Sequence, residues 1–250
     1  MISVCVATYN GEKYIEEQLD SILNNICSDD EIVVSDDGSN DNTLNILNEY
    51  RCKYPNIKII NGPKKGVVQN FQNAIYYAKG DFIFLSDQDD IWENNKVICV
   101  MDYLTTKGYS LIVHDASLID GEGKKIEDSF FAIRKSKSGL IKNFIKNSYI
   151  GCCMAFTSEM KKYILPIPSN IEMHDWWIGL VSEIYGKTFF LEDKLIRYRR
   201  HEKNVSQMYH YPIYKMILNR ILIHCSYKLL CDFCQFTMRS RPSIVGELIA

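Results

Sequence analysis

The stretch Asp81–Trp92, DFIFLSDQDDIW, decides the fold, because an apolar strand runs directly into a cluster of carboxylates, Asp87, Asp89 and Asp90. In an open α/β sheet, ligands bind in the crevice beyond the carboxyl ends of the strands. Carboxylates gathered there repel one another unless a cation joins them. The stretch therefore predicts a divalent-metal site that holds an anionic group, most simply a diphosphate.

A second interpretation of the same residues needs no metal. Acidic residues after a strand also form turns and helix starts, and Asp90 is suited to cap a helix predicted over Asn94–Leu104. The rest of the chain has to decide between the two.

Strands and helices alternate through the first half of the chain. Short runs rich in Val, Ile and Phe predict strands at Ile2–Ala7, Glu31–Ser35, Ile57–Ile60 and Asp81–Ser86. Apolar residues at helical spacing predict helices between them, over Ile15–Ile26, around Leu44 and Leu47, and over Phe71–Ala78. Such βα repeats predict an α/β fold, Rossmann-like, with a mostly parallel sheet and helices on both faces.

The loops after the first two strands carry more polar residues than turns require. These residues are Thr8, Tyr9, Asn10 and Glu12 after the first strand, and Asp36 and Asp37 after the second. Carboxylates accept hydrogen bonds from a base or a ribose, while Thr8 and Tyr9 offer a hydroxyl and a ring face for stacking. Together with the acidic cluster, these loops predict a nucleotide pocket.

Five motifs resemble, in order, those of one enzyme family. They are VATYNGEKYIEEQLDSIL, VVSDDGSNDNT, FLSDQDDIW, MHDWW and YRRHEKNVS, and they run from about Ile2 to Ser206. In them the chain is similar to the family 2 glycosyltransferases, and most to the bacterial rhamnosyltransferase-like subgroup of O-antigen, capsule or cell-wall polysaccharide synthesis. The resemblance implies the GT-A fold, a nucleotide-sugar donor, Mg²⁺ or Mn²⁺, and inversion at the anomeric carbon.

The resemblance also implies roles for individual residues of the first three motifs. The implied donor-binding residues are Thr8, Tyr9, Asn10, Glu12, Asp36, Asp37, Asp87 and Gln88. Within that set, Asp37 matches the acid that pairs with a pyrimidine base, and Asp87 lies nearer the ribose. Asp89 matches the direct metal ligand. Lys64, Lys65 and Gln69 depart from the family pattern, and the role of the two lysines stays open.

The later motifs imply the base and a second metal ligand. Asp175 matches the catalytic base, which is needed because a sugar hydroxyl is a weak nucleophile. Asp175 is equally suited to cap a helix over Trp176–Ile184. His201 matches a histidine that in some relatives completes the metal shell, and its alternative is a solvated loop histidine.

Four residues are expected on the acceptor side: Gly151, Trp176, Trp177 and Arg199. We expect one tryptophan to fill the core and the other to serve as a platform for a sugar face. The alternative for Gly151 is a simple turn into a strand predicted over Cys152–Phe156.

Composition narrows the class of protein. A net charge of -2 gives no electrostatic case for nucleic acid. Several of the nine cysteines lie in apolar runs, which is typical of free thiols in a reducing cytoplasm. Cys231 and Cys234 have no second pair at zinc spacing and are expected to lie in a helix core. The first strand begins at Ile2 without a signal segment, so we expect a cytoplasmic protein.

Two domains are expected: a catalytic domain over 1–206 and a helical C-terminal appendage over 207–250. In the appendage, Tyr214–Phe236 is apolar and basic but lacks an uninterrupted apolar stretch long enough to span a membrane. It is expected either to lie on an anionic inner leaflet, where lipid-linked acceptors reside, or to pack on the catalytic domain.

The predicted function is that of an inverting glycosyltransferase. It would move a sugar, rhamnose or another deoxyhexose, from a nucleoside-diphosphate sugar to a hydroxyl of a growing bacterial surface glycan. Two alternatives are an aspartate-based phosphatase, which also places DxD after an apolar strand, and a non-catalytic nucleotide-sugar-binding protein, which would need no base such as Asp175.

Overall fold

The computed structural model describes residues 1–202 of the chain. The chain divides into one compact unit over Met1–Gln207 and another over Met208–Ala250. The expected helical appendage, its membrane contact and the pair Cys231 and Cys234 all lie outside the described residues, and so they stay predictions.

The first half forms the βα repeats that the sequence predicts. Its elements are β1 (Ile2–Thr8), α1 (Ile15–Leu23), β2 (Glu31–Asp36), α2 (Thr43–Lys53), β3 (Ile57–Asn61), α3 (Val67–Tyr77) and β4 (Phe82–Ser86). The strands pair in parallel in the order β3-β2-β1-β4. The apolar residues of β1, β2 and β4 are almost all buried, as expected for central strands covered on both faces.

The second half extends the same sheet with mixed strand directions. Its strands are β5 (Ile91–Trp92), β6 (Leu111–Ile119), β7 (Lys125–Glu127), β8 (Met154–Thr157) and β9 (Thr188–Arg199). Its helices are α4 (Lys96–Met101), the π-helix η1 (Asp102–Thr106), α5 (Phe130–Arg134), α6 (Leu140–Ile145), the 3₁₀ turns η2 (Gly151–Cys153) and η3 (Ser158–Met160), α7 (Lys161–Ile164) and α8 (His174–Tyr185). The sheet order continues β4-β8-β6-β9-β5, and β7 pairs with β6.

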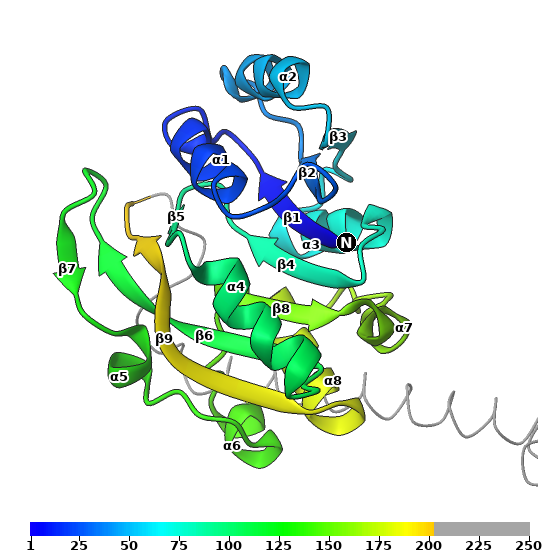
Figure 1. Ribbon diagram of the computed structural model, residues 1–250, viewed down its shortest axis with the longest axis vertical. Coiled ribbons are helices and arrows are strands. Elements are labelled where there is room, and N and C mark those ends of the chain that lie inside the picture. Colours follow the sequence, from blue (N-terminus) through cyan, green and yellow to red (C-terminus); the bar gives the residue numbers. More distant parts are fainter. Residues whose placement is uncertain (203–250) are drawn as a thin grey trace, which may run out of the picture. The chain divides into compact units, whose positions relative to one another are not determined.

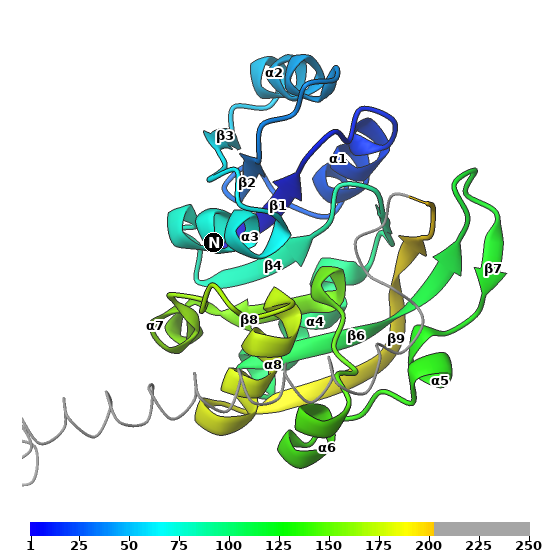
Figure 2. The same cartoon turned by 180° about the vertical axis from the view of Figure 1, so that it is seen from behind.

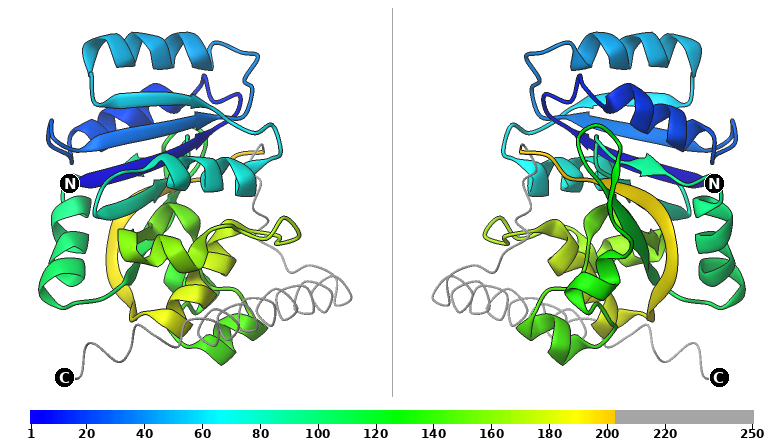
Figure 3. Two further views of the ribbon diagram at one scale, coloured as in Figure 1. Left: turned by 90° about the vertical axis from the view of Figure 1, so that its right-hand side faces the viewer. Right: turned by 90° about the vertical axis from the view of Figure 1, so that its left-hand side faces the viewer.

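Helices cover both faces of this sheet. In Figure 1, α4 lies in front of the strands, whereas α3 and α8 lie in front of them in the view from behind (Figure 2). Figure 3 shows β9 as a long, curved strand, which closes the sheet around the second half of the domain. Within residues 1–202, every helix is too short or too polar to cross a bilayer. The α/β fold class predicted from the sequence is confirmed.

Two local expectations need correction. Asp90 does not cap the next helix, because β5 intervenes and α4 begins at Lys96 after Asn95. The helix then continues as η1, where Lys107 N bonds to the carbonyl oxygen of Asp102 at 3.3 Å. The strand predicted from Cys152 begins only at Met154, after the turn η2.

The parallel strands bring the chemically active loops to one edge of the sheet. Thr8 at the end of β1 is in register with Asp36 at the end of β2, and Val6 of β1 with Ser86 at the end of β4. The loops that follow β1, β2 and β4 therefore leave the sheet side by side, at the edge where α/β proteins bind ligands.

Candidate active site

The Asp36 carboxylate holds the loop after β2 in place by accepting hydrogen bonds. Its Oδ2 accepts hydrogen bonds from Thr8 Oγ1 (3.0 Å) and Ser39 Oγ (2.5 Å), and its Oδ1 accepts from the backbone N–H of Gly38 and Ser39. The carboxylate is buried and has its hydrogen bonds inside the protein. Thr8 and Asp36, both predicted to bind donor, thus meet at the carboxyl ends of β1 and β2.

Asp37 ties this loop to the loop after β3. Its Oδ1 accepts from Lys64 N (2.6 Å) and its Oδ2 from Gly66 N (2.8 Å). A Cβ added at Gly38 would lie 2.9 Å from Lys64 Cε, so the Lys64 side chain crosses this glycine. The structure thereby places Lys64, whose role the sequence left open, beside Asp37.

Gln88 joins the loop after β1 to the acidic cluster. Tyr9 N donates to Gln88 Oε1 (2.9 Å), and Gln88 Nε2 donates back to the Tyr9 carbonyl oxygen (3.1 Å). A side chain at Gly11 would collide with Gln88, because a Cβ there would lie 2.4 Å from Oε1. Tyr9 is 55% exposed, which leaves its ring available for stacking.

Asn10 and Glu12 hold the same loop against the chain after β2. Asn10 Oδ1 accepts from Asn40 N (2.9 Å), and Glu12 Oε2 accepts from Asn42 N (2.8 Å). These two predicted donor residues hold the loops after β1 and β2 together through backbone amides.

In the acidic cluster Asp89 and Asp90 are buried and Asp87 is half-buried, and their negative charges repel one another. Burial, and after it the charges of Asp89 and Asp175, raise the pKa of Asp87 to about 7. Burial also raises the pKa of Asp90 well above its usual range. Asp90 Oδ1 accepts from Arg199 N (2.9 Å), whereas Oδ2 has no hydrogen-bond partner within residues 1–202. Carboxylates in this state gain from a cation.

The residues present fit a divalent cation. Asp89 Oδ2 lies 2.7 Å from His201 Nε2, so the two predicted ligands meet. Next to them, Asp87, Asp90 and Cys152 place ligand atoms within 4.8 Å of one another. Burial raises the pKa of the Cys152 thiol well above its usual range, so it stays protonated. Carboxylate oxygens with one imidazole suit Mg²⁺ or Mn²⁺.

Two buried basic side chains lie next to the acidic cluster. Lys96 is fully buried; its Nζ donates to the Cys152 carbonyl oxygen (2.9 Å) and lies 3.9 Å from the Trp92 ring centre. Arg199 is also buried; its Nε donates to the Asp89 carbonyl oxygen (2.8 Å) and its Nη2 to Glu17 Oε2 (2.5 Å). The Arg199 guanidinium thus binds the acidic loop and α1, and its acceptor role stays a prediction.

Asp175 lies in the first turn of α8, with Met173 in the capping position. Its Oδ1 accepts from Trp176 N (2.5 Å) and from Asn147 Nδ2 (3.5 Å). Burial raises the pKa of Asp175 to about 6, although these hydrogen bonds oppose the shift. The Asp175 charge in turn helps to raise the pKa of Asp87, so the candidate base lies close enough to Asp87 for the two carboxylates to interact.

The other predicted acceptor residues are buried in the protein near Asp175. Trp177 Nε1 donates to the Ile164 carbonyl oxygen, and Trp176 Nε1 donates to that of Asn143; both indoles are buried. Little ring surface therefore remains for a sugar platform. Gly151 begins η2, and a Cβ there would lie 2.5 Å from His174 Nε2, so glycine is required for this packing.

Sequence reasoning included Asp90 in the acidic cluster without giving it a role of its own, and it did not assign Lys96 and Asn147 to the site. The third carboxylate of SDQDD was a signal for Asp90. Lys96 had a weaker signal, a lysine close behind the acidic run. Asn147 had none, because only the tertiary fold brings it to Asp175.

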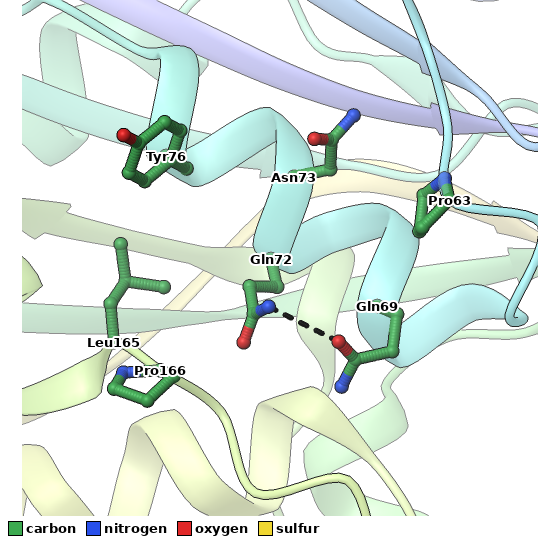
Figure 4. Close-up of a pocket in the computed structure, with 7 residues that line it drawn as sticks. All are labelled: Pro63, Gln69, Gln72, Asn73, Tyr76, Leu165 and Pro166. Atoms are coloured by element: carbon green, nitrogen blue, oxygen red, sulfur yellow. Dashed lines mark hydrogen bonds between the residues drawn. The ribbon is translucent and has the colours of Figure 1, made fainter.

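A separate groove of about 330 Å³ lies along α3. Figure 4 shows Gln69 and Gln72 of α3 linked by a hydrogen bond (3.1 Å), with Leu165 and Pro166 on the opposite side. Gln72 Oε1 also accepts from Ile167 N (2.6 Å), which fixes the segment leading to α8. None of the predicted catalytic, donor, metal or acceptor residues lines this groove.

Comparison with known proteins agrees with this geometry. The model of glycosyl transferase family 2 matches residues 3–164. The chain belongs to glycosyltransferase family 2. A curated relative, "dTDP-rhamnosyl transferase RfbG" of Shigella flexneri, is 32% identical over 214 residues, covering 80% of this chain and 72% of the relative. A second relative, an uncharacterized glycosyltransferase from Nostoc, is 26% identical, and the match covers 81% of this chain and 66% of that protein.

Solved structures share the fold of this family 2 chain. TarS residues 1–349 from S. aureus, in complex with UDP-GlcNAc, has a TM-score of 0.70 at 20% identity, with 89% of this chain and 66% of that one covered. The mannosyltransferase PcManGT from Pyrobaculum calidifontis, in complex with GDP-Man and Mn²⁺, has a TM-score of 0.63 at 18% identity, covering 81% and 58%. The GT-A fold is confirmed, and the phosphatase alternative finds no support.

Proposed function

We propose that this chain transfers a deoxyhexose, with inversion, from a nucleoside-diphosphate sugar to a hydroxyl of a lipid-linked bacterial surface glycan. The observation that carries the proposal is the proximity of the buried Asp175 carboxylate to Asp87 after β4, whose pKa the charge of Asp175 helps to raise. A base and an acidic diphosphate site at one edge of the sheet are what a direct sugar transfer requires. The named relative, a dTDP-rhamnosyl transferase, supports rhamnose as the sugar.

Asp175 would take the proton of the acceptor hydroxyl. Its environment is suited to this, because the Asp175 side chain is buried and little water reaches it. A carboxylate with a pKa of about 6 is ionised at neutral pH and is a stronger base than an exposed aspartate. Asn147 and the Gly151 backbone orient the carboxylate through hydrogen bonds.

The donor would lie across the loops after β1, β2 and β4. Tyr9 would stack on the base, Asp37 and the adjoining Lys64 would contact the base edge, and Asp87 would approach the ribose. Asp89 and His201 would hold Mg²⁺ or Mn²⁺, which supplies positive charge for the diphosphate leaving group. Gln88 keeps the first and third of these loops in register.

The pH dependence of turnover should show the titration of Asp175. The group works only when ionised, so activity should fall about tenfold per pH unit below about pH 6 and stay level above it. A bound cation would move this limb to lower pH. The Asn147→Ala variant loses a hydrogen bond that lowers the pKa, and its limb should lie at higher pH. If wild type and Asn147→Ala lost activity over the same acid pH range, the titrating group would not be Asp175.

Asp37→Ala should act mainly on donor binding. The variant loses a base contact made equally in the ground and transition states, and it also releases the backbone amides of Lys64 and Gly66. We expect the donor KM to rise about tenfold or more with kcat little changed. Steady-state kinetics would measure both, and a fall in kcat alone would contradict this role for Asp37.

A screen of nucleotide sugars by thermal unfolding tests the proposed function. A donor that binds the folded chain raises its Tm, by an amount that grows with ligand concentration. We expect dTDP-rhamnose to stabilise the protein with Mn²⁺ present and much less after chelation. Equal stabilisation in both conditions, or none by any nucleotide sugar, would refute the proposal.

A further inference from the structure

Helix α6 has its polarity reversed relative to an ordinary surface helix. Surface helices bury an apolar stripe and expose polar residues. In α6, Asn143 is fully buried, whereas Ile141 is 78% exposed. Further large apolar side chains are exposed on α5 and α6, namely Ile133, Leu140 and Ile145.

The buried face of α6 is held by polar contacts. Asn143 Nδ2 donates to the carbonyl oxygens of Lys137 (2.9 Å) and Gly139 (3.1 Å), and its Oδ1 accepts from Ser148 Oγ (2.5 Å). Its carbonyl oxygen accepts from Trp176 Nε1 (2.8 Å), which attaches α6 to α8. The outward isoleucine at 141 therefore has no part in fixing this helix to the domain.

The same surface is strongly basic. Residues 129–158 contain no Asp or Glu, and their basic residues are Arg134, Lys135, Lys137, Lys142 and Lys146. Lys142 Nζ donates to the Lys135 carbonyl oxygen (2.7 Å), which brings these two basic residues together. Burial and the charges of Lys137 and Lys146 lower the pKa of Lys142. Glu183, which reaches this segment from α8, accepts from Gly139 N (2.7 Å) and Tyr149 Oη (3.3 Å). Basic residues and exposed apolar side chains thus alternate along the same segment.

This surface is built on the segment that supports the base. Arg134 Nη2 donates to the Asn147 carbonyl oxygen (3.2 Å), and Asn147 Nδ2 donates to Asp175. In Figures 1 and 2, α6 lies beside α8, whose first turn carries Asp175. Whatever binds α5 and α6 is held near the acceptor side of the site.

We propose that the surface formed by α5, α6 and the lysines between them docks on an anionic lipid leaflet. Exposed aliphatic side chains enter the headgroup boundary while lysines pair with lipid phosphates, which is the chemistry of an interfacial segment. The docking itself does not depend on the proposed function, but its role does: it would bring the hydroxyl of a lipid-linked acceptor to Asp175. Its residues are distinct in sequence from the basic apolar segment Tyr214–Phe236.

Vesicle co-sedimentation of the full chain tests the docking without any donor. Ile141→Asp should weaken binding to phosphatidylglycerol–phosphatidylcholine vesicles by about tenfold or more, because it removes an apolar anchor and adds repulsion. Lys135→Gln with Lys137→Gln should weaken it by about fivefold per lysine, and less at high salt. Ile98→Asp, at a site 74% exposed on α4, is the matched control and should bind as wild type.

Each outcome of the vesicle experiment can be interpreted without measuring catalysis. Loss of vesicle binding with unchanged thermal stabilisation by donor supports the docking. Wild-type vesicle binding by both surface variants overturns it. A lower Tm of Ile141→Asp with unchanged vesicle binding also overturns it, since the face would then pack against the chain's own remainder. A change of oligomeric state in Ile141→Asp, again with unchanged vesicle binding, would assign the face to a second copy. Absence of donor binding in wild type would sink the proposed function and leave the vesicle result intact.

Discussion

Asp175→Asn should lower kcat by about 10²-fold or more while donor affinity stays near that of wild type. The substitution keeps the size of the side chain and an oxygen that can accept from Trp176 N, so the first turn of α8 should persist. It removes only the proton acceptor.

Two measurements are needed to interpret this variant. Calorimetry gives the donor affinity, and a radiolabelled-sugar assay gives the turnover. Weak donor binding together with slow turnover would indicate a disturbed pocket and not a missing base. Turnover near that of wild type would reduce Asp175 to a residue of the first helical turn.

Asp89→Ala should abolish transfer and remove the metal dependence of donor binding. Asp89 Oδ2 lies 2.7 Å from His201 Nε2, and the backbone around it is held by Arg199 Nε, so the fold should survive loss of the carboxylate. Without the ligand, the diphosphate would meet Asp87 and Asp90 with less compensating charge. We expect Mn²⁺ to stop improving donor affinity altogether.

An exposed aspartate provides the matched control. Asp29→Ala changes the net charge equally, far from the acidic cluster in sequence and in a loop outside the site. It should keep metal-dependent binding and full activity. If Asp89→Ala remained active in the presence of chelator, the metal site would have to be sought elsewhere.

The βα half of the fold could be predicted because its signals are local. The apolar runs at β1, β2, β3 and β4 are short and continuous, and turn residues mark their ends. The second half could not, since β8 inserts between β4 and β6, and β5 pairs with β9 across a long stretch of chain. Such pairings depend on tertiary contacts that no local pattern contains.

The site was predictable where chemistry is concentrated in motifs. SDQDD and MHDWW marked the carboxylates that the structure brings together, and the pKa of Asp87 reflects the charge of Asp175. Supporting residues were harder. A lysine on a helix is normally exposed, yet Lys96 is fully buried beside the cluster. The reversed polarity of α6 likewise contradicts any pattern that assigns isoleucine to the core and asparagine to the surface.

The anomeric configuration of the transferred sugar tests the central claim most directly. A single displacement, with Asp175 as base and the nucleoside diphosphate as leaving group, inverts the anomeric carbon. Proton NMR of the product formed on a lipid-linked acceptor should therefore show the configuration opposite to that of the donor. Retention of the donor configuration would require a covalent or front-face route, and it would contradict the role of Asp175 as the base in a direct displacement.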